Sequence, residues 1–521
     1  MAHTSHAHSS FRRFGAALGI LTTTAATVAP QGRSPLPTGR SSYRTPTEVS
    51  YELERLAATY PDNVVRFELP HRSLLGQRMY ALAISHNVKT SVGKPVFLMT
   101  GLHHAREWPT VELTLEFVWD ILQNDGKDPR ITSLLERVRF LVVPVVNPDG
   151  YDMSRSMINE NKRKNCRIEP GKVPTWADCA DSVNRNAGVD LNRNYGPFWG
   201  GLGASVAPGG NWRGESPYSE PEIQNLRDLM ASNQVVVALS NHTPDAKVLR
   251  VPSAANEPTP ADVAPYDSLA QDLGRDLKWQ AGPWDPKVAG GVYYVATGTM
   301  EENAYYTSGT FAFTFENTPQ GPGFHPPYFK VLDQYFGTGV YPGSSARAGF
   351  LRLYEAAANT AWHSILKVKA PAGSTLSIQK HFTMETSPVV IADPPQRGGG
   401  GAGGGGGAGR GVPPDSAAAG RGRGAVRDST PQPPPATGPP QTFAVELKSS
   451  LVVPRSASGT TGIAEVEWHV NPSVRPSQHA QDWIPETWKL RCTPPKGAGT
   501  RTVEVRVTRG AVASVDMSRC R

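Results

Sequence analysis

Residues 95–108 read Pro95-Val96-Phe97-Leu98-Met99-Thr100-Gly101-Leu102-His103-His104-Ala105-Arg106-Glu107-Trp108. The first six residues form an apolar run with the length of a buried β-strand, and the remainder form a polar turn. An imidazole and a carboxylate three positions apart on such a turn, His104 and Glu107, can face one cation, and zinc accepts nitrogen and oxygen ligands together. An ordinary polar turn can contain the same pair by chance, so the surrounding sequence must decide between the two interpretations.

The surrounding sequence predicts an α/β domain with a largely buried mixed sheet over about residues 42–367. Short β-branched or aromatic runs, each ending at a polar segment, predict further strands at Phe140–Val146, Val235–Leu239 and Thr310–Phe315. Apolar residues at helical spacing predict helices at Thr110–Gln123 and Ala346–Leu366. Because ligands bind beyond the carboxyl ends of strands in open α/β sheets, we expect a single site there.

A third metal ligand can come from His242, at the end of another predicted strand. A lone His at a strand end is usually a buried residue with satisfied hydrogen bonds. Here it completes a set of two nitrogens and one carboxylate, which leaves a fourth position for water, as catalytic zinc requires. Asn241-His242-Thr243 also fits a glycosylation acceptor, but an acceptor inside a cleft would be inaccessible.

Over about residues 43–367, the chain resembles the metallocarboxypeptidases of the carboxypeptidase A and B type in several motifs that follow one another in order along the sequence. The motifs are HxxE with Trp108, Asn147-Pro148-Asp149-Gly150-Tyr151, Gly188-Val189-Asp190-Leu191-Asn192-Arg193-Asn194, Asn-His after a strand, Tyr294, and Phe313-Thr314-Phe315-Glu316. The resemblance implies a mixed sheet of eight strands flanked by helices. It also implies one Zn²⁺ and a peptide or protein C-terminus as the substrate.

The resemblance implies that His104, Glu107 and His242 bind zinc and that Asp190 orients His104 from behind. A ligating imidazole commonly donates its other N–H to a carboxylate in this way. Glu316 corresponds to the glutamate that takes a proton from water and returns it to the leaving amine.

Arg163 matches the arginine that stabilises the oxyanion. Lys162 stands where many relatives have an aromatic residue, and Lys164 is a neighbouring alternative.

For the substrate, the resemblance implies that Asn192 and Arg193 hold the terminal carboxylate, a role suited to the fixed fork of a guanidinium. Tyr294 corresponds to a mobile tyrosine that closes over the substrate, although Tyr293 is adjacent. Arg106 is expected to contact the peptide further along. Glu301 aligns with the floor of the pocket for the departing side chain, where an acid would favour Lys or Arg. If Glu301 points away, the pocket is apolar or broad.

Residues 1–29 have the layout of a secretory signal peptide, with Arg12 and Arg13 ahead of an apolar run and then small residues. A disordered basic tail is the alternative. The four cysteines fit an oxidising compartment, and Cys166 with Cys179 and Cys492 with Cys520 are the local pairs among the three possible pairings. Their spacings are too wide for CxxC zinc pairs. We expect a secreted protein, extracellular or periplasmic, without a membrane span.

After the catalytic domain at 43–367, we expect an extension at 368–395, a flexible linker rich in Gly and Pro at 396–441, and a small all-β domain at 442–521. Strict alternation at 464–470 and 503–507 predicts half-buried strands in the last domain. The ligand of this tail is unknown.

The 53 Lys and Arg against 46 Asp and Glu give a charge of +7. Because this excess is diffuse, we expect no nucleic-acid partner. We expect a monomer. The sequence leaves two alternatives: a related zinc hydrolase acting on cell-wall peptides, or an inactive secreted binding protein.

Overall fold

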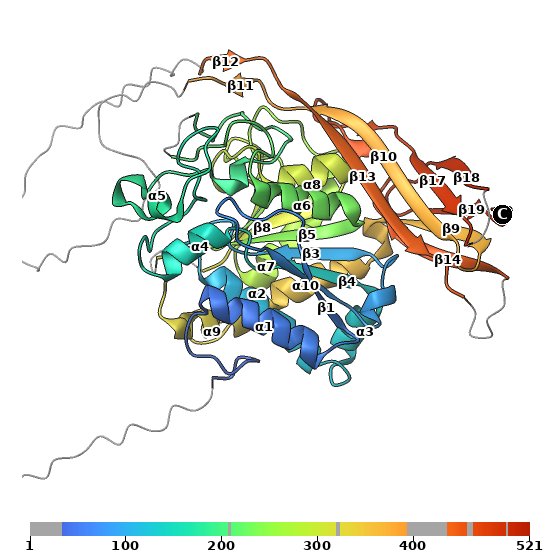
Figure 1. The fold of residues 1–521 in the computed structure, drawn as a ribbon, viewed down its shortest axis with the longest axis horizontal. Helices are drawn as coiled ribbons and strands as arrows, with labels where there is room; N and C mark the ends of the chain where they lie inside the picture. Colours follow the sequence, from blue (N-terminus) through green and yellow to red (C-terminus); the bar gives the residue numbers. More distant parts are fainter. Residues whose placement is uncertain are drawn as a thin grey trace, which may run out of the picture.

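The N-terminal part of the chain, in which we expect the catalytic domain, is built on one eight-stranded sheet with the order β1-β2-β4-β3-β5-β8-β6-β7 (Figure 1). The computed structural model describes residues 34–206, 210–318, 323–392, 435–455, 462–495 and 499–520. The strands are β1 Val64–Glu68, β2 Tyr80–Ile84, β3 Val96–Thr100, β4 Arg139–Val143, β5 Val235–His242, β6 Lys247–Arg250, β7 Gln280–Pro283 and β8 Phe311–Glu316. Parallel and antiparallel pairs both occur, so the predicted mixed sheet of eight strands is confirmed.

Helices cover both faces of this sheet, so its central strands are buried on both sides. Along β3, Phe97 and Met99 enter one apolar cluster, whereas Val96 and Leu98 enter the other. This alternation between two buried faces explains why the strand reads as a continuous apolar run. The helices are α1 Pro46–Thr59, α2 Pro109–Gln123, α3 Pro129–Arg137, α4 Pro148–Arg155, α5 Trp176–Ala180, α6 Pro221–Ser232, α7 Val263–Leu277, α8 Met300–Ser308, α9 Tyr328–Phe336 and α10 Ala346–Ala358.

Helix α8 begins and ends at residues that suit helix termini. Thr299 and Glu302 form a reciprocal capping box at its start, and Gly309 ends it in a left-handed conformation (φ 75°). Both devices satisfy backbone groups that a helix leaves unpaired at its ends. They fix the position of Glu301 in the first turn.

The segment before α1 is attached to α2 by a buried ionic network around Arg44. The Arg44 guanidinium, which is fully buried, contacts three glutamates: Glu52 (2.6 and 2.9 Å), Glu116 (2.8 Å) and Glu112. The Arg44 backbone N–H also donates to Glu112 at 2.6 Å. One cation therefore serves three buried carboxyl groups.

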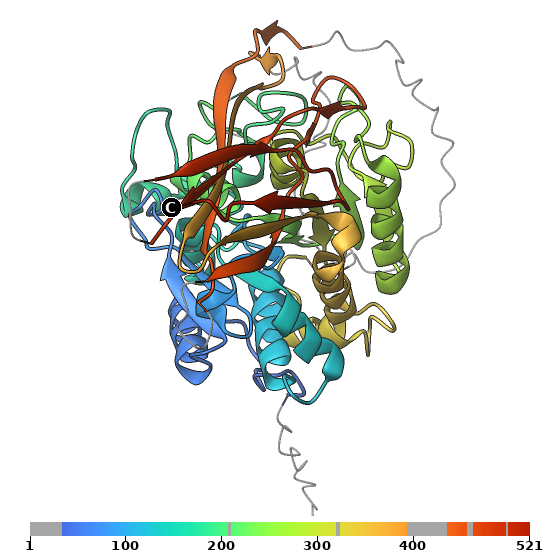
Figure 2. The same cartoon turned by 90° about the vertical axis from the view of Figure 1, so that its right-hand side faces the viewer.

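The C-terminal part is a β-sandwich that lies beside the N-terminal part (Figure 2). One sheet has the order β13-β10-β17-β18, the other β14-β9-β19. Its core includes Trp468 and Trp488. The strands of this part are β9 Ser364–Pro371, β10 Thr375–Glu385, β11 Val389–Val390, β12 Thr437–Gly438, β13 Thr442–Val452, β14 Ile463–Val470, β15 Arg475–Pro476, β16 Trp483–Ile484, β17 Trp488–Thr493, β18 Arg501–Val505 and β19 Val512–Asp516.

Two expectations differ from the structure here. The predicted helix Ala346–Leu366 stops at Ala358, because Asn359 turns the chain and residues 364–371 become β9, which pairs with β14 and β19. Within the expected separate extension at 368–395, the described residues 368–392 supply the second half of β9 and the whole of β10 and β11, and β9 and β10 lie in the two sheets of the sandwich. The expected signal peptide and most of the expected linker lie outside the described residues.

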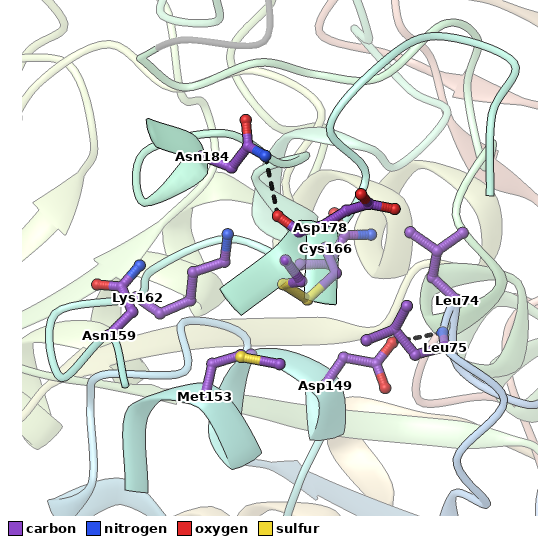
Figure 3. The surroundings of a disulfide bond; sticks show 12 residues. Leu74, Leu75, Asp149, Met153, Asn159, Lys162, Cys166, Asp178 and Asn184 are labelled. Carbon is purple, nitrogen blue, oxygen red and sulfur yellow. Dashed lines mark hydrogen bonds between the residues drawn. A yellow bond between two sulfur atoms is a disulfide. The ribbon is translucent and has the colours of Figure 1, made fainter. Parts of the chain in front are cut away.

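Both predicted local disulfides are present, Cys166–Cys179 and Cys492–Cys520, so a zinc site made of these four cysteines is excluded. The first closes a loop against α4, where Met153 and Leu74 pack around it (Figure 3). Within the described ranges, no helix combines the length and apolar character needed to span a bilayer.

Candidate metal centre and substrate cleft

Three adjacent parallel strands, β3, β5 and β8, bring the predicted site residues together. The turn that carries His104 and Glu107 follows β3, while His242 is the last residue of β5 and Glu316 the last of β8. His242 and Glu316 are partners in the strand register, so their side chains leave the same face of the sheet. Residues more than 200 positions apart in the sequence thus meet at one edge.

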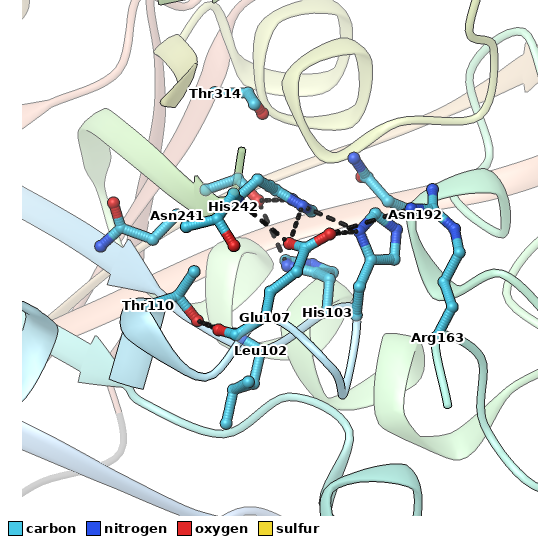
Figure 4. A network of polar contacts seen from close by, with 12 residues as sticks. Leu102, His103, Glu107, Thr110, Arg163, Asn192, Asn241, His242 and Thr314 are labelled. Atoms are coloured by element: carbon cyan, nitrogen blue, oxygen red, sulfur yellow. Dashed lines mark hydrogen bonds and ion pairs between the residues drawn. The ribbon is translucent and has the colours of Figure 1, made fainter. Parts of the chain in front are cut away.

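His104, Glu107 and His242 form a buried cluster whose ligand atoms all lie within 4.8 Å of one another. Figure 4 shows Glu107 and His242 of this cluster pointing toward each other. His104 Nδ1 is 2.8 Å from Glu107 Oε1 and 3.0 Å from His242 Nδ1, and His242 Nδ1 is 3.0 Å from Glu107 Oε2. Burial lowers the pKa of His242 to about 4, so this imidazole is neutral at pH 7. Two imidazole nitrogens and a carboxylate therefore converge on one point.

The groups behind the two imidazoles turn their Nδ1 lone pairs toward that point. Asp190 Oδ1 lies 3.1 Å from His104 Nε2 and, as a carboxylate, can only accept, so Nε2 carries the proton. Ser240 Oγ lies 2.9 Å from His242 Nε2 and can accept its proton in the same way. A cation would satisfy the three facing acceptors, and the nitrogen and oxygen set suits zinc.

A third histidine, His103, for which the sequence predicts no role, packs behind His242. It is fully buried, with Nδ1 3.2 Å from Ser240 Oγ and Nε2 2.8 Å from the Tyr195 hydroxyl. Its ring stacks on His242, with 5.5 Å between the centroids. The doubled His and the Ser two residues before His242 were the available signals, but neither indicates a contact without the fold.

Arg163 lies beside the metal ligands and pairs with Asp190. Its Nε and Nη2 atoms donate to Asp190 Oδ2 at 3.1 and 2.9 Å, and Nη1 is 3.8 Å from Glu107 Oε1. Burial alone would raise the pKa of Asp190, but the Arg163 guanidinium holds that pKa well below its ordinary value. Asp190 is therefore ionised and anchors both Arg163 and His104.

Glu316 is buried, and its pKa is raised well above the ordinary value, first by burial and then by the Glu107 charge. A carboxyl group whose protonated form is favoured in this way is suited to proton transfer.

Asn192, Arg193 and Tyr294 contact one another through the Arg193 guanidinium. The Arg193 guanidinium, fully buried, donates from Nη2 to the Tyr294 hydroxyl at 3.2 Å, from Nη1 to the Asn192 carbonyl at 2.7 Å, and from Nε to the Gly203 carbonyl at 3.3 Å. Asn192 Oδ1 accepts from the Met300 N–H, whereas Asn192 Nδ2 is buried without a partner among the described residues. The neighbouring Tyr293 packs on Tyr294 at 4.1 Å.

Arg106 projects from the metal-binding turn and lies 3.9 Å from the centroid of the Phe324 ring. Burial lowers its pKa to about 10, with a smaller effect from Arg163, so it still carries its charge at pH 7.

Glu301 is fully buried and accepts a hydrogen bond from the Thr314 hydroxyl, two residues before Glu316 on β8. Its other oxygen, Oε2, has no partner within the part of the chain that the structure describes. Burial raises the pKa of Glu301 to about 7. The side chain thus points into the domain toward β8, and not into solvent.

A family model for zinc carboxypeptidases matches residues 49–335. This chain belongs to the zinc carboxypeptidase family. The β-sandwich lies outside the matched residues. Carboxypeptidase A2 of Mus musculus is 30% identical over 299 residues, which are 56% of this chain and 66% of that protein. Carboxypeptidase B of Astacus astacus is 27% identical over 318 residues, 60% of this chain and 98% of that protein. The match covers less than two thirds of the Mus musculus carboxypeptidase A2 and 62% of its Rattus norvegicus counterpart.

Among solved structures, thrombin activatable fibrinolysis inhibitor matches with a TM-score of 0.53 at 23% identity, over 64% of this chain and 78% of that chain. Carboxypeptidase A from Helicoverpa armigera matches with a TM-score of 0.51 at 24% identity, over 61% and 74%. These likenesses agree with the zinc carboxypeptidase fold. Zn²⁺ is the cofactor that the family implies, and the buried trio of His104, Glu107 and His242 fits it.

Proposed function

We propose that this protein is a zinc-dependent exopeptidase that removes the C-terminal residue of peptides. The observation that carries the proposal is the buried cluster of His104, Glu107 and His242 together with the buried Arg193 guanidinium, which lies near enough to Asp190, the partner of His104, to lower its pKa. A metal site alone fits many hydrolases. A fixed guanidinium beside it fits a substrate with a free carboxylate.

In this proposal, His104, Glu107 and His242 hold the zinc, and Asp190 orients His104. When bound, zinc supplies Lewis-acid activation of water and of the scissile carbonyl group. Glu316 takes a proton from the attacking water and delivers it to the amine that leaves.

Arg163 stabilises the negative charge that develops on the carbonyl oxygen. Its ion pair with Asp190 holds the guanidinium in place before the reaction, so little reorganisation accompanies the charge development.

Asn192 and Arg193 bind the terminal carboxylate, and this requirement restricts cleavage to chain ends. The buried Asn192 Nδ2 donor without a protein partner supports this role, because a substrate oxygen would satisfy it. Tyr294, whose hydroxyl accepts a hydrogen bond from Arg193, closes over the substrate. Arg106 contacts the peptide upstream of the scissile bond.

We further propose a preference for C-terminal Lys or Arg. The unpartnered Oε2 of Glu301 supports it, because a cationic side chain reaching this atom would gain a charge-assisted hydrogen bond. We also propose that the protein is secreted, extracellular or periplasmic. The signal-like residues 1–29 and two disulfides support this location. It acts as a monomer without nucleic-acid partners.

The test is mass spectrometry of synthetic peptides ending in Lys, Arg, Phe, Leu or Glu, incubated with purified protein. We expect loss of one C-terminal residue, fastest for Lys and Arg, with no cleavage after chelation and recovery on adding zinc. The same peptides with an amidated C-terminus are the matched control and should stay intact.

If zinc-loaded protein leaves every free C-terminus intact, the exopeptidase proposal is wrong. Equal cleavage rates for peptides ending in Phe and in Lys would support the exopeptidase proposal but refute the proposed role of Glu301.

A further inference from the structure

The loop at residues 196–203 directly follows the carboxylate-binding pair and contains four glycines, Gly196, Gly200, Gly201 and Gly203. Gly200 and Gly203 both have a φ of 80°, a conformation that side-chain-bearing residues rarely adopt. So many glycines make a loop intrinsically pliable. Its shape must therefore be fixed by the groups that contact it.

On one side, the loop contacts Arg193 and the segment that carries Tyr294. The Gly203 carbonyl accepts from Arg193 Nε at 3.3 Å, and the Leu202 carbonyl accepts from the Thr297 hydroxyl at 2.8 Å. A Cβ at Gly203 would lie 2.1 Å from the Val295 carbonyl oxygen, so the loop touches the backbone next to Tyr294. A shift of this loop would move the supports of Arg193.

On its outer side, the loop contacts a two-stranded ribbon from the β-sandwich. Strands β10 and β13 continue past the sandwich as β11 and β12, and this ribbon, residues 375–391 with 435–452, runs along the catalytic part to the loop (Figures 1 and 2). The Val390 N–H donates to the Gly200 carbonyl at 2.7 Å. Arg213 Nη2 donates to the Val390 carbonyl at 2.5 Å, and a Cβ at Gly200 would lie 3.2 Å from Val389.

The ribbon also contacts the start of the loop. The Phe443 ring of β13 packs edge-on against Tyr218 at 5.6 Å. A Cβ at Gly196 would lie 2.7 Å from Phe443 and 2.5 Å from Tyr218, so only glycine allows the ribbon to approach this closely. Arg213 is tied to the same region, because its carbonyl accepts from the Trp199 indole at 3.0 Å and from Asn194 Nδ2 at 2.7 Å.

We propose that this ribbon braces the 196–203 loop and thereby positions Arg193 for the terminal carboxylate of the substrate. The C-terminal β-sandwich thus supports substrate binding in the catalytic part. The inference rests on the proposed function, since it assumes that Arg193 binds a carboxylate. Val390 is a positioning residue that acts through Gly200 and the loop.

Val390→Pro in the full chain tests the brace, because it removes the N–H that bonds to Gly200. Ile391, and not Val390, donates to the paired strand at Ala436, so the ribbon keeps that bond. We expect KM for peptides with a free C-terminus to rise at least about tenfold with kcat changed less than about threefold, since small misplacements of a binding group are costly. Inhibition by Nα-acetylarginine should weaken by the same factor as KM rises.

Val390→Ala is the matched control, because it trims the side chain but keeps the N–H and the carbonyl. It should leave KM within about twofold. Hydrogen exchange measured by mass spectrometry should show faster exchange over residues 194–205 in Val390→Pro than in Val390→Ala. If Val390→Pro does not fold, Arg213→Gln, which removes the donor to the Val390 carbonyl, should raise KM and loop exchange instead.

Unchanged KM and unchanged loop exchange in folded Val390→Pro would overturn the brace. So would equal rises in KM for Val390→Pro and Val390→Ala. Wild-type protein that cleaves no C-terminal residue would refute the proposed function instead, and with it the link to Arg193, while the exchange comparison would still report on the brace.

Discussion

Arg44→Met should destabilise the protein far more than an ordinary surface change. The substitution keeps most of the side-chain length but removes the one cation among Glu52, Glu112 and Glu116, all of them buried. Removing one partner of a buried ion pair costs about 3–5 kcal/mol, because the remaining charge stays without compensation. With an unfolding entropy of about 2.1 cal/mol/K per residue, 1 kcal/mol corresponds to about 1 °C in a chain of this size, so Tm should fall by roughly 3–5 °C.

The loss should depend on pH in a defined direction. In the wild-type protein, burial raises the pKa of Glu52, but the pairing with Arg44 outweighs burial, so the pKa of Glu52 lies below its ordinary value. Burial raises the pKa of Glu112 above its ordinary value. Without Arg44, burial is no longer offset at Glu52 and Glu112, so the folded-state pKa values of these two carboxyls rise above the unfolded value of about 4.3. The folded state then binds more protons than the unfolded state, so stability falls as pH rises above about 4.3. The deficit should be larger at pH 8 than at pH 5.

The assay is urea unfolding at pH 5 and pH 8, with Arg40→Met as the matched control. Arg40 pairs with Glu48 at 3.1 Å on the surface, and such pairs contribute about 1 kcal/mol or less. If Arg44→Met costs no more than Arg40→Met, or if its cost does not change with pH, the argument from the buried network is refuted.

Glu316→Gln should lower kcat by about 10²–10⁴-fold through loss of proton transfer, while zinc content by elemental mass spectrometry stays at one per chain. Glu301→Gln should abolish the preference for Lys and Arg over Phe. Because burial raises the pKa of Glu301 to about 7, that preference in the wild type should fall as pH drops from 8 to 6, measured as a ratio of kcat/KM values. Asp190→Asn should weaken zinc binding in chelator competition by about 10–100-fold. Replacing Cys166 and Cys179 together by Ser should lower the free energy of unfolding by about 2–4 kcal/mol, read from chemical denaturation.

The sequence predicted the candidate site more completely than it predicted the architecture. His104, Glu107 and His242 each follow a recognisable strand, so the edge of the sheet where they meet could be predicted. Glu301 could be placed in the sequence but not oriented, because its direction depends on the packing of α8 against β8. The Arg44 network gave no signal, since its partners lie on two different helices.

The C-terminal half was harder because its strands pair with distant partners. Apolar residues continue at helical spacing beyond Ala358, and nothing local indicates that Ile365 will pair with His469 on one side and Val512 on the other. Strand pairing across such separations is set by tertiary contacts that local propensity does not report.

The place of β9 in its sheet has a consequence for synthesis of the protein. β9 lies between β14 and β19, and its partner β19 begins almost 150 residues later in the sequence. A ribosome makes the entire zinc site well before it makes β19, so a nascent chain holds all the reactive groups while the sandwich is still incomplete. The sheet that contains β9 can therefore be completed only after translation has passed Asp516, long after the residues of the candidate metal centre have been made.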